Sequence, residues 1–351
     1  MFKSLHVKNF RAITDLTVDD LSSVNLFVGH NASGKTTLLE AAFLLIGPTN
    51  PSLPLNVNAF RGFSYVSPAT WPTYFHNMDV NTPIYVAAKE ANSDEEHRLV
   101  IRPRYERPEA KRFVSDVMLD QPGAPSTAED DGAINGLELE YTTSVDPHTK
   151  EQSSVYLREK ELVYEGRRAS RRNGAFVMAL PADLKNRFSD IQRKKRVKEV
   201  VSLLQELEPT VNDLRLIDPP GLPYADTGAG EMIPLNLMGG GMMKLLSTAL
   251  TMLNMQDGFV LIDEIENGLG YASQRKLWQA VFSWAQKLNI QVFASTHSME
   301  CIRAFSDLSE LGLFGADAKL FRVERRGDVF RSVEYDRQIL AESLESGWEV
   351  R

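Results

Sequence analysis

The sequence predicts an α/β fold in which a parallel sheet is built from both ends of the chain. A mixed strand-and-helix segment is inserted between those ends. The apolar run from Val24 to Val28 stops at a glycine, and a helical pattern begins at Thr36. The same order of strand and helix resumes after residue 235. Short apolar strands that alternate with helices are typical of parallel sheets with right-handed crossovers.

The composition limits the class of protein. A net charge of −8 argues against bulk, non-specific coating of nucleic acid, although it leaves room for a local basic patch. The single cysteine, Cys301, excludes an intrachain disulfide; we expect a small core residue and a reducing compartment. The N-terminus runs directly into a strand pattern without a signal peptide, and no apolar run reaches the roughly 18 residues of a membrane span. We therefore expect a cytoplasmic protein.

The N-terminal elements follow from periodicity. Residues 2–8 alternate as a half-buried strand, and the stretch 16–18 is suited to pair with it. Residues 24–28 are expected to form a fully buried strand. The helix that follows places apolar residues on one face and ends at Gly47-Pro48; these residues are Leu38, Leu39, Ala42, Phe43 and Ile46.

The middle of the chain is less regular. Residues 48–75 are expected to be loop, although their aromatic cluster of Trp71, Tyr74, Phe75 and His76 suits a core. Further expectations are strands at 84–88, 99–102 and 137–141, a mobile loop at 121–136, basic helices over 181–207, and a proline- and glycine-rich boundary at 208–235. We expect residues 1–62 and 215–351 to form one domain and 63–214 an inserted α+β lobe.

The clearest motif is a phosphate-binding loop, Gly29-His30-Asn31-Ala32-Ser33-Gly34-Lys35-Thr36. Its glycines let backbone N–H groups turn towards phosphate oxygens, its lysine reaches the β- and γ-phosphates, and its threonine hydroxyl can bind Mg²⁺. The motif lies between a buried strand and an apolar helix, which is the context it requires. A glycine-rich turn without a ligand is the weaker alternative.

Two acids end a later apolar strand. Asp263 follows the apolar strand Phe259–Ile262. In P-loop proteins a carboxylate at this position holds the Mg²⁺ shell. Glu264 comes next and is expected to act as the general base for the attacking water. The alternative is a pair of acids that merely cap the strand.

His297 follows the next apolar strand, Ile290 to Ser295, and is expected to sense or stabilise the γ-phosphate. A histidine of this kind is often structural when it stands alone.

Gly239, Gly240 and Gly241 precede an apolar helix and predict a second anion site at its N-terminus. One chain needs only one phosphate loop per nucleotide, so this site suits the nucleotide of another copy; a flexible linker is the alternative.

In this order the elements resemble the head of an ABC-type P-loop ATPase of the RecF/SMC/OLD-like branch. The resemblance covers residues 1–60 and 235–351 and rests on these motifs: Leu5 to Arg11, the Walker A loop, Asp263 to Leu269 as Walker B and D-loop, Thr296-His297-Ser298 as H-loop, and the tail from Tyr335.

In that family two heads enclose two ATP molecules. The resemblance implies a homodimer, or a higher oligomer, that hydrolyses ATP with Mg²⁺ held by Thr36 and Asp263, and with Glu264 and His297 as catalytic residues. It also implies these nucleotide contacts: Arg11, Gly29, Asn31, Ala32, Ser33, Gly34, Lys35, Thr36, Thr37 and, from the partner, Gly239, Gly240 and Gly241. For Arg11 an ordinary surface arginine is the alternative.

The sequence also departs from the family. Met238 stands where the signature serine is usual, which removes a hydroxyl donor and predicts slow hydrolysis. Gly270 stands in the D-loop where related proteins often have histidine, and no glutamine is assigned to the Q-loop.

The resemblance implies a switch that works with an effector, a nuclease or toxin, in antiphage defence or a toxin–antitoxin pair. No nuclease domain fits after His297, so we expect a separate effector protein. The basic segments Arg167–Arg172 and Arg193–Lys198 suit either a nucleic acid or an acidic partner, or are simply solvated. A RecF-like DNA-repair ATPase is therefore the alternative, whereas a transporter subunit and an SMC clamp are disfavoured by the signature and by the missing coiled coil.

Overall fold

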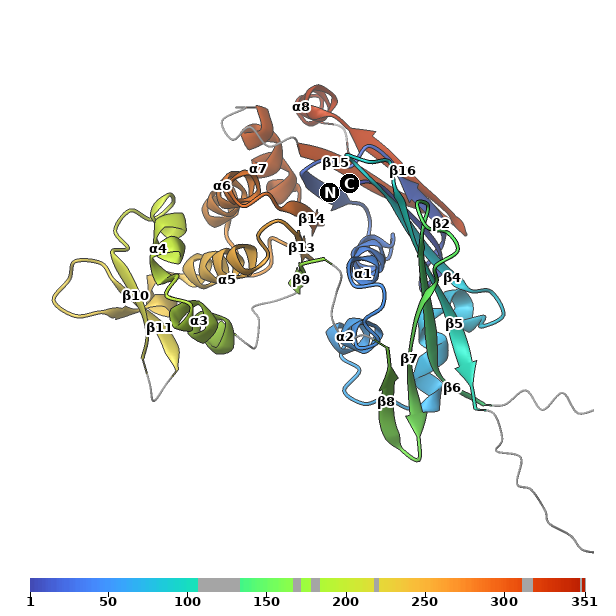
Figure 1. Cartoon of the computed structure of the whole chain (residues 1–351). Helices are drawn as coiled ribbons and strands as arrows, with labels where there is room; N and C mark the ends of the chain where they lie inside the picture. The colour runs from blue at the N-terminus through green and yellow to red at the C-terminus, as the bar shows by residue number, and fades with distance from the viewer. Residues whose placement is uncertain are drawn as a thin grey trace, which may run out of the picture.

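The computed structural model describes residues 1–106, 133–166, 172–177, 184–217, 221–310, 318–347 and 349–350. Within these ranges two large sheets lie on either side of helix α1 (Lys35–Ile46), and most of the other helices cover the far face of one of them (Figure 1). Residues 121–132 of the expected mobile loop at 121–136 lie outside the described residues, and so do residues 167–171 of the basic segment Arg167–Arg172.

The first sheet is the predicted parallel sheet. Its strand order is β16 (Val329–Tyr335), β15 (Ala318–Arg326), β3 (Val24–Val28), β14 (Gln291–Ser295), β13 (Phe259–Ile262) and β9 (Gly174–Val177). All neighbours are parallel except β15 and β16. The carboxyl ends of β3, β13 and β14 therefore lie at one edge, which is where parallel sheets bind ligands.

The second sheet is antiparallel and joins the N-terminus to the middle of the chain. Its order is β2 (Ile13–Val18), β1 (Phe2–Phe10), β4 (Ile84–Glu90), β5 (Glu96–Tyr105), β6 (Ile134–Thr143), β7 (Glu151–Arg158) and β8 (Glu161–Glu165). The expected strands at 84–88, 99–102 and 137–141 all form. Because β4 pairs with β1, and β9 joins the parallel sheet, the expected boundaries at 62/63 and 214/215 do not separate one sheet from another.

Helix α1 is buried on every side from Thr37 to Ile46, rather than on the one face that its pattern suggested. The reason is that both sheets pack against it, and a helix that is covered all round carries apolar residues all round. The phosphate loop is thereby fixed between two rigid layers.

The other face of the parallel sheet carries a helical layer and a second core. Its helices are α3 (Leu184–Arg193), α4 (Val197–Gln205), α5 (Gly240–Asn254), α6 (Tyr271–Lys287), α7 (Met299–Glu310) and α8 (Arg337–Glu345). The predicted boundary at 208–235 is in fact a small sheet of β10 (Asp213–Ile217), β11 (Leu222–Asp226) and β12 (Ile233–Pro234). Its prolines misled the prediction, because short edge strands tolerate proline.

The prediction of loop over 48–75 was wrong. The segment forms α2 (Leu53–Phe60) and the 3₁₀ turns η1 (Pro68–Tyr74) and η2 (His76–Met78). Pro54 lies in the first turn of α2, where a missing N–H costs no intrahelical hydrogen bond. Trp71, Tyr74 and Phe75 are buried, so the aromatic cluster is core as expected, and Cys301 is buried as well.

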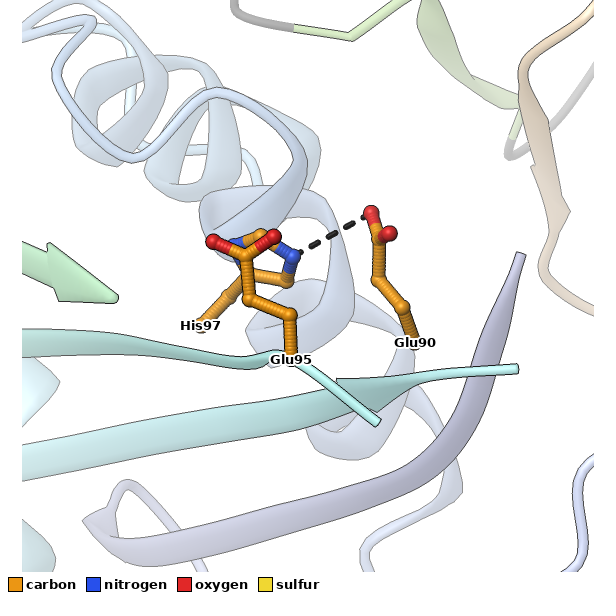
Figure 2. Close-up of side chains that lie close together, drawn as sticks. All are labelled: Glu90, Glu95 and His97. Atoms are coloured by element: carbon orange, nitrogen blue, oxygen red, sulfur yellow. Dashed lines mark ion pairs between the residues drawn. The ribbon is translucent and has the colours of Figure 1, made fainter. Parts of the chain in front are cut away.

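One polar cluster joins the two sheets. Glu90 and His97, near the ends of β4 and β5, lie 3.1 Å apart, with Glu95 beside them (Figure 2). The Arg172 guanidinium, just before β9, lies 2.5 Å from Glu90 Oε1 and 2.7 Å from His97 Nε2. Arg172 thus occupies the place that a metal ion would need, and the cluster is an ion-paired link between sheets.

Among the described residues, no helix has both the length and the apolar character needed to cross a membrane.

Candidate nucleotide site

The phosphate loop leaves β3 through Gly29, whose φ of +146° is open only to glycine. A Cβ atom there would lie 2.4 Å from the carbonyl oxygen of Val323 on β15. The loop then turns back and enters α1 at Lys35. The motif therefore needs its first glycine both for the backbone angle and for the close approach of β15.

Lys35 points back into its own loop. Its Nζ donates to the carbonyl oxygens of Gly29 at 2.8 Å and His30 at 3.0 Å. Burial lowers the pKa of Lys35, whereas the nearby carboxylates of Asp263, Glu264 and Glu266 raise it. Lys35 and the predicted acids Asp263 and Glu264 thus lie within electrostatic reach of one another.

Thr36 and Asp263 meet although they are 227 residues apart. The Thr36 hydroxyl donates to Asp263, with oxygen distances of 2.9 and 3.1 Å. Ser295, the last residue of β14, also donates its hydroxyl to Asp263. Hydroxyl and carboxylate oxygens are the ligands that Mg²⁺ prefers, so this oxygen set fits a magnesium ion beside the phosphate loop.

Glu264 follows Asp263 in a turn after β13, and its backbone adopts a left-handed φ of +46°. Its N–H donates to Ser295 Oγ at 2.9 Å, and its side chain accepts from Asn267 Nδ2 at 2.5 Å. The side chain is 48% exposed, so water reaches it. Adjacent acids on a strand would point to opposite faces; the turn brings both to one edge of the sheet.

His297 lies at the same edge, after β14. Its Nδ1 is 4.0 Å from Glu264 Oε1 and 3.1 Å from Glu266 Oε1. Ser295 and Glu266 were not predicted as site residues. Ser295 could have been recognised because it ends a buried strand that neighbours the strand before Asp263. Glu266 could have been recognised because it follows Glu264 by two residues in the same acidic motif.

Arg11 lies apart from this cluster. Its Nε is 3.2 Å from Glu40 Oε2, its Nη2 donates to Asn58 at 2.8 Å, and its side chain is only 11% exposed. It is therefore not a surface arginine, and its guanidinium engages the helix behind the loop. That it contacts nucleotide stays a prediction.

Arg61, after α2, was missed in the sequence. It binds Glu40 with two nitrogens, at 2.6 and 3.1 Å, and its Nη2 is 3.5 Å from Thr37 Oγ1. A positive charge is thereby held beside the first turn of α1.

Gly239 to Gly241 lie at the N-terminus of α5. Gly239 has a φ of +105° and nothing within 4 Å of its Cβ position, and α5 begins directly after it. The neighbouring Leu237 is 73% exposed. Helices α5 and α1 lie on opposite sides of β13 and β14 (Figure 1), so each helix N-terminus has its own surroundings.

A cavity of about 390 Å³ borders the phosphate loop on the side of β15. It is lined by Gly29 to Ser33, by Arg322 to Arg326 and by Glu349. Three arginines and two glutamates make its wall polar. The outer surface of the loop is thus open to a polar ligand.

Comparison with known proteins agrees with this geometry. Residues 24–303 match the family described as "AAA domain, putative AbiEii toxin, Type IV TA system". An ATP/GTP phosphatase of Helicobacter pylori is 21% identical over 92% of this chain and 92% of its own length. An OLD nuclease of Thermus scotoductus is 45% identical over 53 residues, which are 15% of this chain and 10% of that protein.

Among solved structures, an Smc head bound to the C-winged helix domain of ScpA matches 98% of this chain and 99% of its own chain, at 14% identity and a TM-score of 0.49. The family match spans the phosphate loop, the acids after β13 and His297. This chain therefore belongs to the family "AAA domain, putative AbiEii toxin, Type IV TA system" and is an ATPase.

Proposed function

We propose that this ATPase is a dimeric switch. ATP lies on Gly29–Thr37 of one subunit and is enclosed by Gly239–Gly241 of the other. The observation that carries this proposal is the exposed glycine turn before α5, which has open space at Gly239 and the exposed Leu237 beside it. Backbone N–H groups at a helix N-terminus bind anions, and α5 lies across the parallel sheet from α1, the helix that begins in the protein's own phosphate loop (Figure 1).

The chemistry within one subunit follows from the same residues. Thr36 and Asp263 would hold Mg²⁺, which neutralises phosphate charge when bound. Lys35 would exchange its two loop carbonyls for phosphate oxygens. Glu264 would take the proton of the attacking water, and His297 would stabilise the γ-phosphate. Met238 offers no hydroxyl at the partner's nucleotide, so we expect slow turnover.

The test uses Glu264→Gln, which keeps the side-chain shape and removes the base. ATP should remain bound and the protein should become a dimer by light scattering. Lys35→Ala is the matched control and should neither bind ATP nor dimerise. Adding Leu237→Asp to Glu264→Gln should restore the monomer while ATP binding persists. Hydrolysis by Glu264→Gln at the parent rate would remove Glu264 as the base, and a monomer with ATP bound would refute the switch.

We further propose that the switch controls an effector protein in antiphage defence or a toxin–antitoxin pair. The family description, with its putative toxin and type IV toxin–antitoxin system, supports this proposal. A strain that carries the gene with its flanking genes should resist phage or show regulated growth arrest, and Lys35→Ala should abolish either effect. The same outcome with parent and Lys35→Ala would contradict the proposal.

The basic segment Arg193–Lys198 favours a protein partner over DNA. Two of its arginines are already paired, Arg193 with Asp190 at 2.7 Å and Arg196 with Glu199 at 2.8 Å. Phosphate contacts would have to displace these acids. Tight DNA binding that falls steeply with salt would instead support the RecF-like alternative.

A further inference from the structure

Glu266 has no part in the mechanism above, yet it holds His297 by two contacts. Its Oε1 accepts from the His297 main-chain N–H at 3.0 Å and lies 3.1 Å from the ring Nδ1. Glu266 is 8% exposed, and the backbone of the preceding Ile265 is fixed to Ser295 at 3.0 Å. The carboxylate is thus a rigid support under the imidazole.

The second oxygen of Glu266 lacks a partner. Glu266 Oε2 is buried without a hydrogen bond among the described residues, and so is Nζ of Lys244 on α5, a residue that is 3% exposed. Burial lowers the pKa of Lys244, and attraction by Glu266 acts in the opposite direction. Lys244 and Glu266 are therefore both buried with one unsatisfied polar atom each, and they attract each other electrostatically.

Such an arrangement is costly, because a buried charge without a partner loses its hydration and regains little. Buried polar groups are usually hydrogen-bonded, so each unsatisfied one calls for an explanation. Here the two charges come from elements with different roles. Glu266 belongs to the turn after β13, and Lys244 lies about one turn into α5, after Gly239–Gly241.

We propose that Glu266 is the positioning residue of His297 and that Lys244 supports Glu266 in this task. This inference rests on the role of His297 proposed above. The Glu266 carboxylate accepts a hydrogen bond from Nδ1–H, which turns Nε2 towards the nucleotide. Lys244 thereby links α5, which faces the nucleotide of the partner subunit, to His297, which faces the nucleotide bound by its own subunit.

The experiment measures kcat and KM for ATP in a set of variants of the full chain. Glu266→Gln keeps size and an oxygen acceptor but removes the charge, and Lys244→Met removes the counter-charge. Asp307→Asn, an exposed carboxylate on the helix after His297, is the matched control. Each variant is also combined with His297→Ala, and Lys244→Met is combined with Glu266→Gln.

We expect Glu266→Gln to lower kcat roughly ten-fold, with little change in KM, because a hydrogen bond to a charged acceptor is stronger than one to a neutral amide. Lys244→Met should lower kcat less and should add nothing in the Glu266→Gln background. In the His297→Ala background neither change should lower kcat further, because both act through His297. Asp307→Asn should match the parent.

A spectroscopic measurement covers the case in which a variant folds poorly. In protein with ¹⁵N-labelled histidine, the His297 ring, assigned by its loss in His297→Ala, should carry its proton on Nδ1 in the parent. Parent protein with the proton only on Nε2 would overturn the proposal. So would an unchanged kcat in Glu266→Gln, or losses that add to that of His297→Ala.

These results separate the two proposals. If His297→Ala hydrolyses ATP at the parent rate, the proposed role of His297 fails and the inference fails with it. If His297→Ala is impaired and Glu266→Gln is not, only the inference fails.

Discussion

Glu40 places a fully buried carboxylate on α1. Its replacement tests whether ion pairs with Arg61 and Arg11 stabilise the packing of this helix. The carboxylate accepts two hydrogen bonds from Arg61 and lies 3.2 Å from Arg11 Nε, although this last contact lacks hydrogen-bond geometry. Glu40→Gln keeps the volume and leaves the nearly buried Arg11 without a counter-charge.

Removal of one partner from a buried ion pair costs about 3–5 kcal/mol. Arg61 is 35% exposed and can recover part of its hydration, so we expect the lower end, about 3 kcal/mol. Urea unfolding followed by fluorescence measures the loss in the free energy of unfolding. Glu199→Gln, which breaks the exposed pair with Arg196, is the control and should cost at most about 1 kcal/mol. A loss of less than about 1 kcal/mol for Glu40→Gln would refute the reasoning.

Two further predictions concern the site edge and the link between sheets. Ser295→Ala should lower kcat roughly ten-fold and raise the Mg²⁺ concentration needed for activity, because Asp263 and the Glu264 N–H lose the hydroxyl that orients them; unchanged Mg²⁺ dependence would contradict this. Burial and the charge of Arg172 lower the pKa of His97 from its ordinary value of 6.5. The unfolded chain therefore binds more protons below pH 6.5, and stability should fall as the pH drops from 7.5 to 5.5. His97→Asn should flatten this slope in thermal unfolding, whereas replacement of the exposed His148 should not.

Local patterns in the sequence were sufficient for the elements that carry the motifs. The buried strand at 24–28, the helix after Thr36, the strand before Asp263 and the helix after Gly239 all form. Each combines a clear apolar run with an end signal, which is why periodicity predicts it. The regions with many prolines were mispredicted, because proline marks a first helical turn or an edge strand as readily as a loop.

The sequence by itself determined the phosphate loop, the order of the later motifs and hence an ATPase with an α/β core. Only the tertiary structure decided which distant residues share the site. Thr36, Asp263 and Ser295 meet because parallel strands end at one edge. The ion pairs of Glu40 and the support of His297 by Glu266 depend on how layers pack. Local sequence patterns indicate which face of a helix or strand is buried. The ion-pair partner of a charged residue is decided only when separate elements pack together.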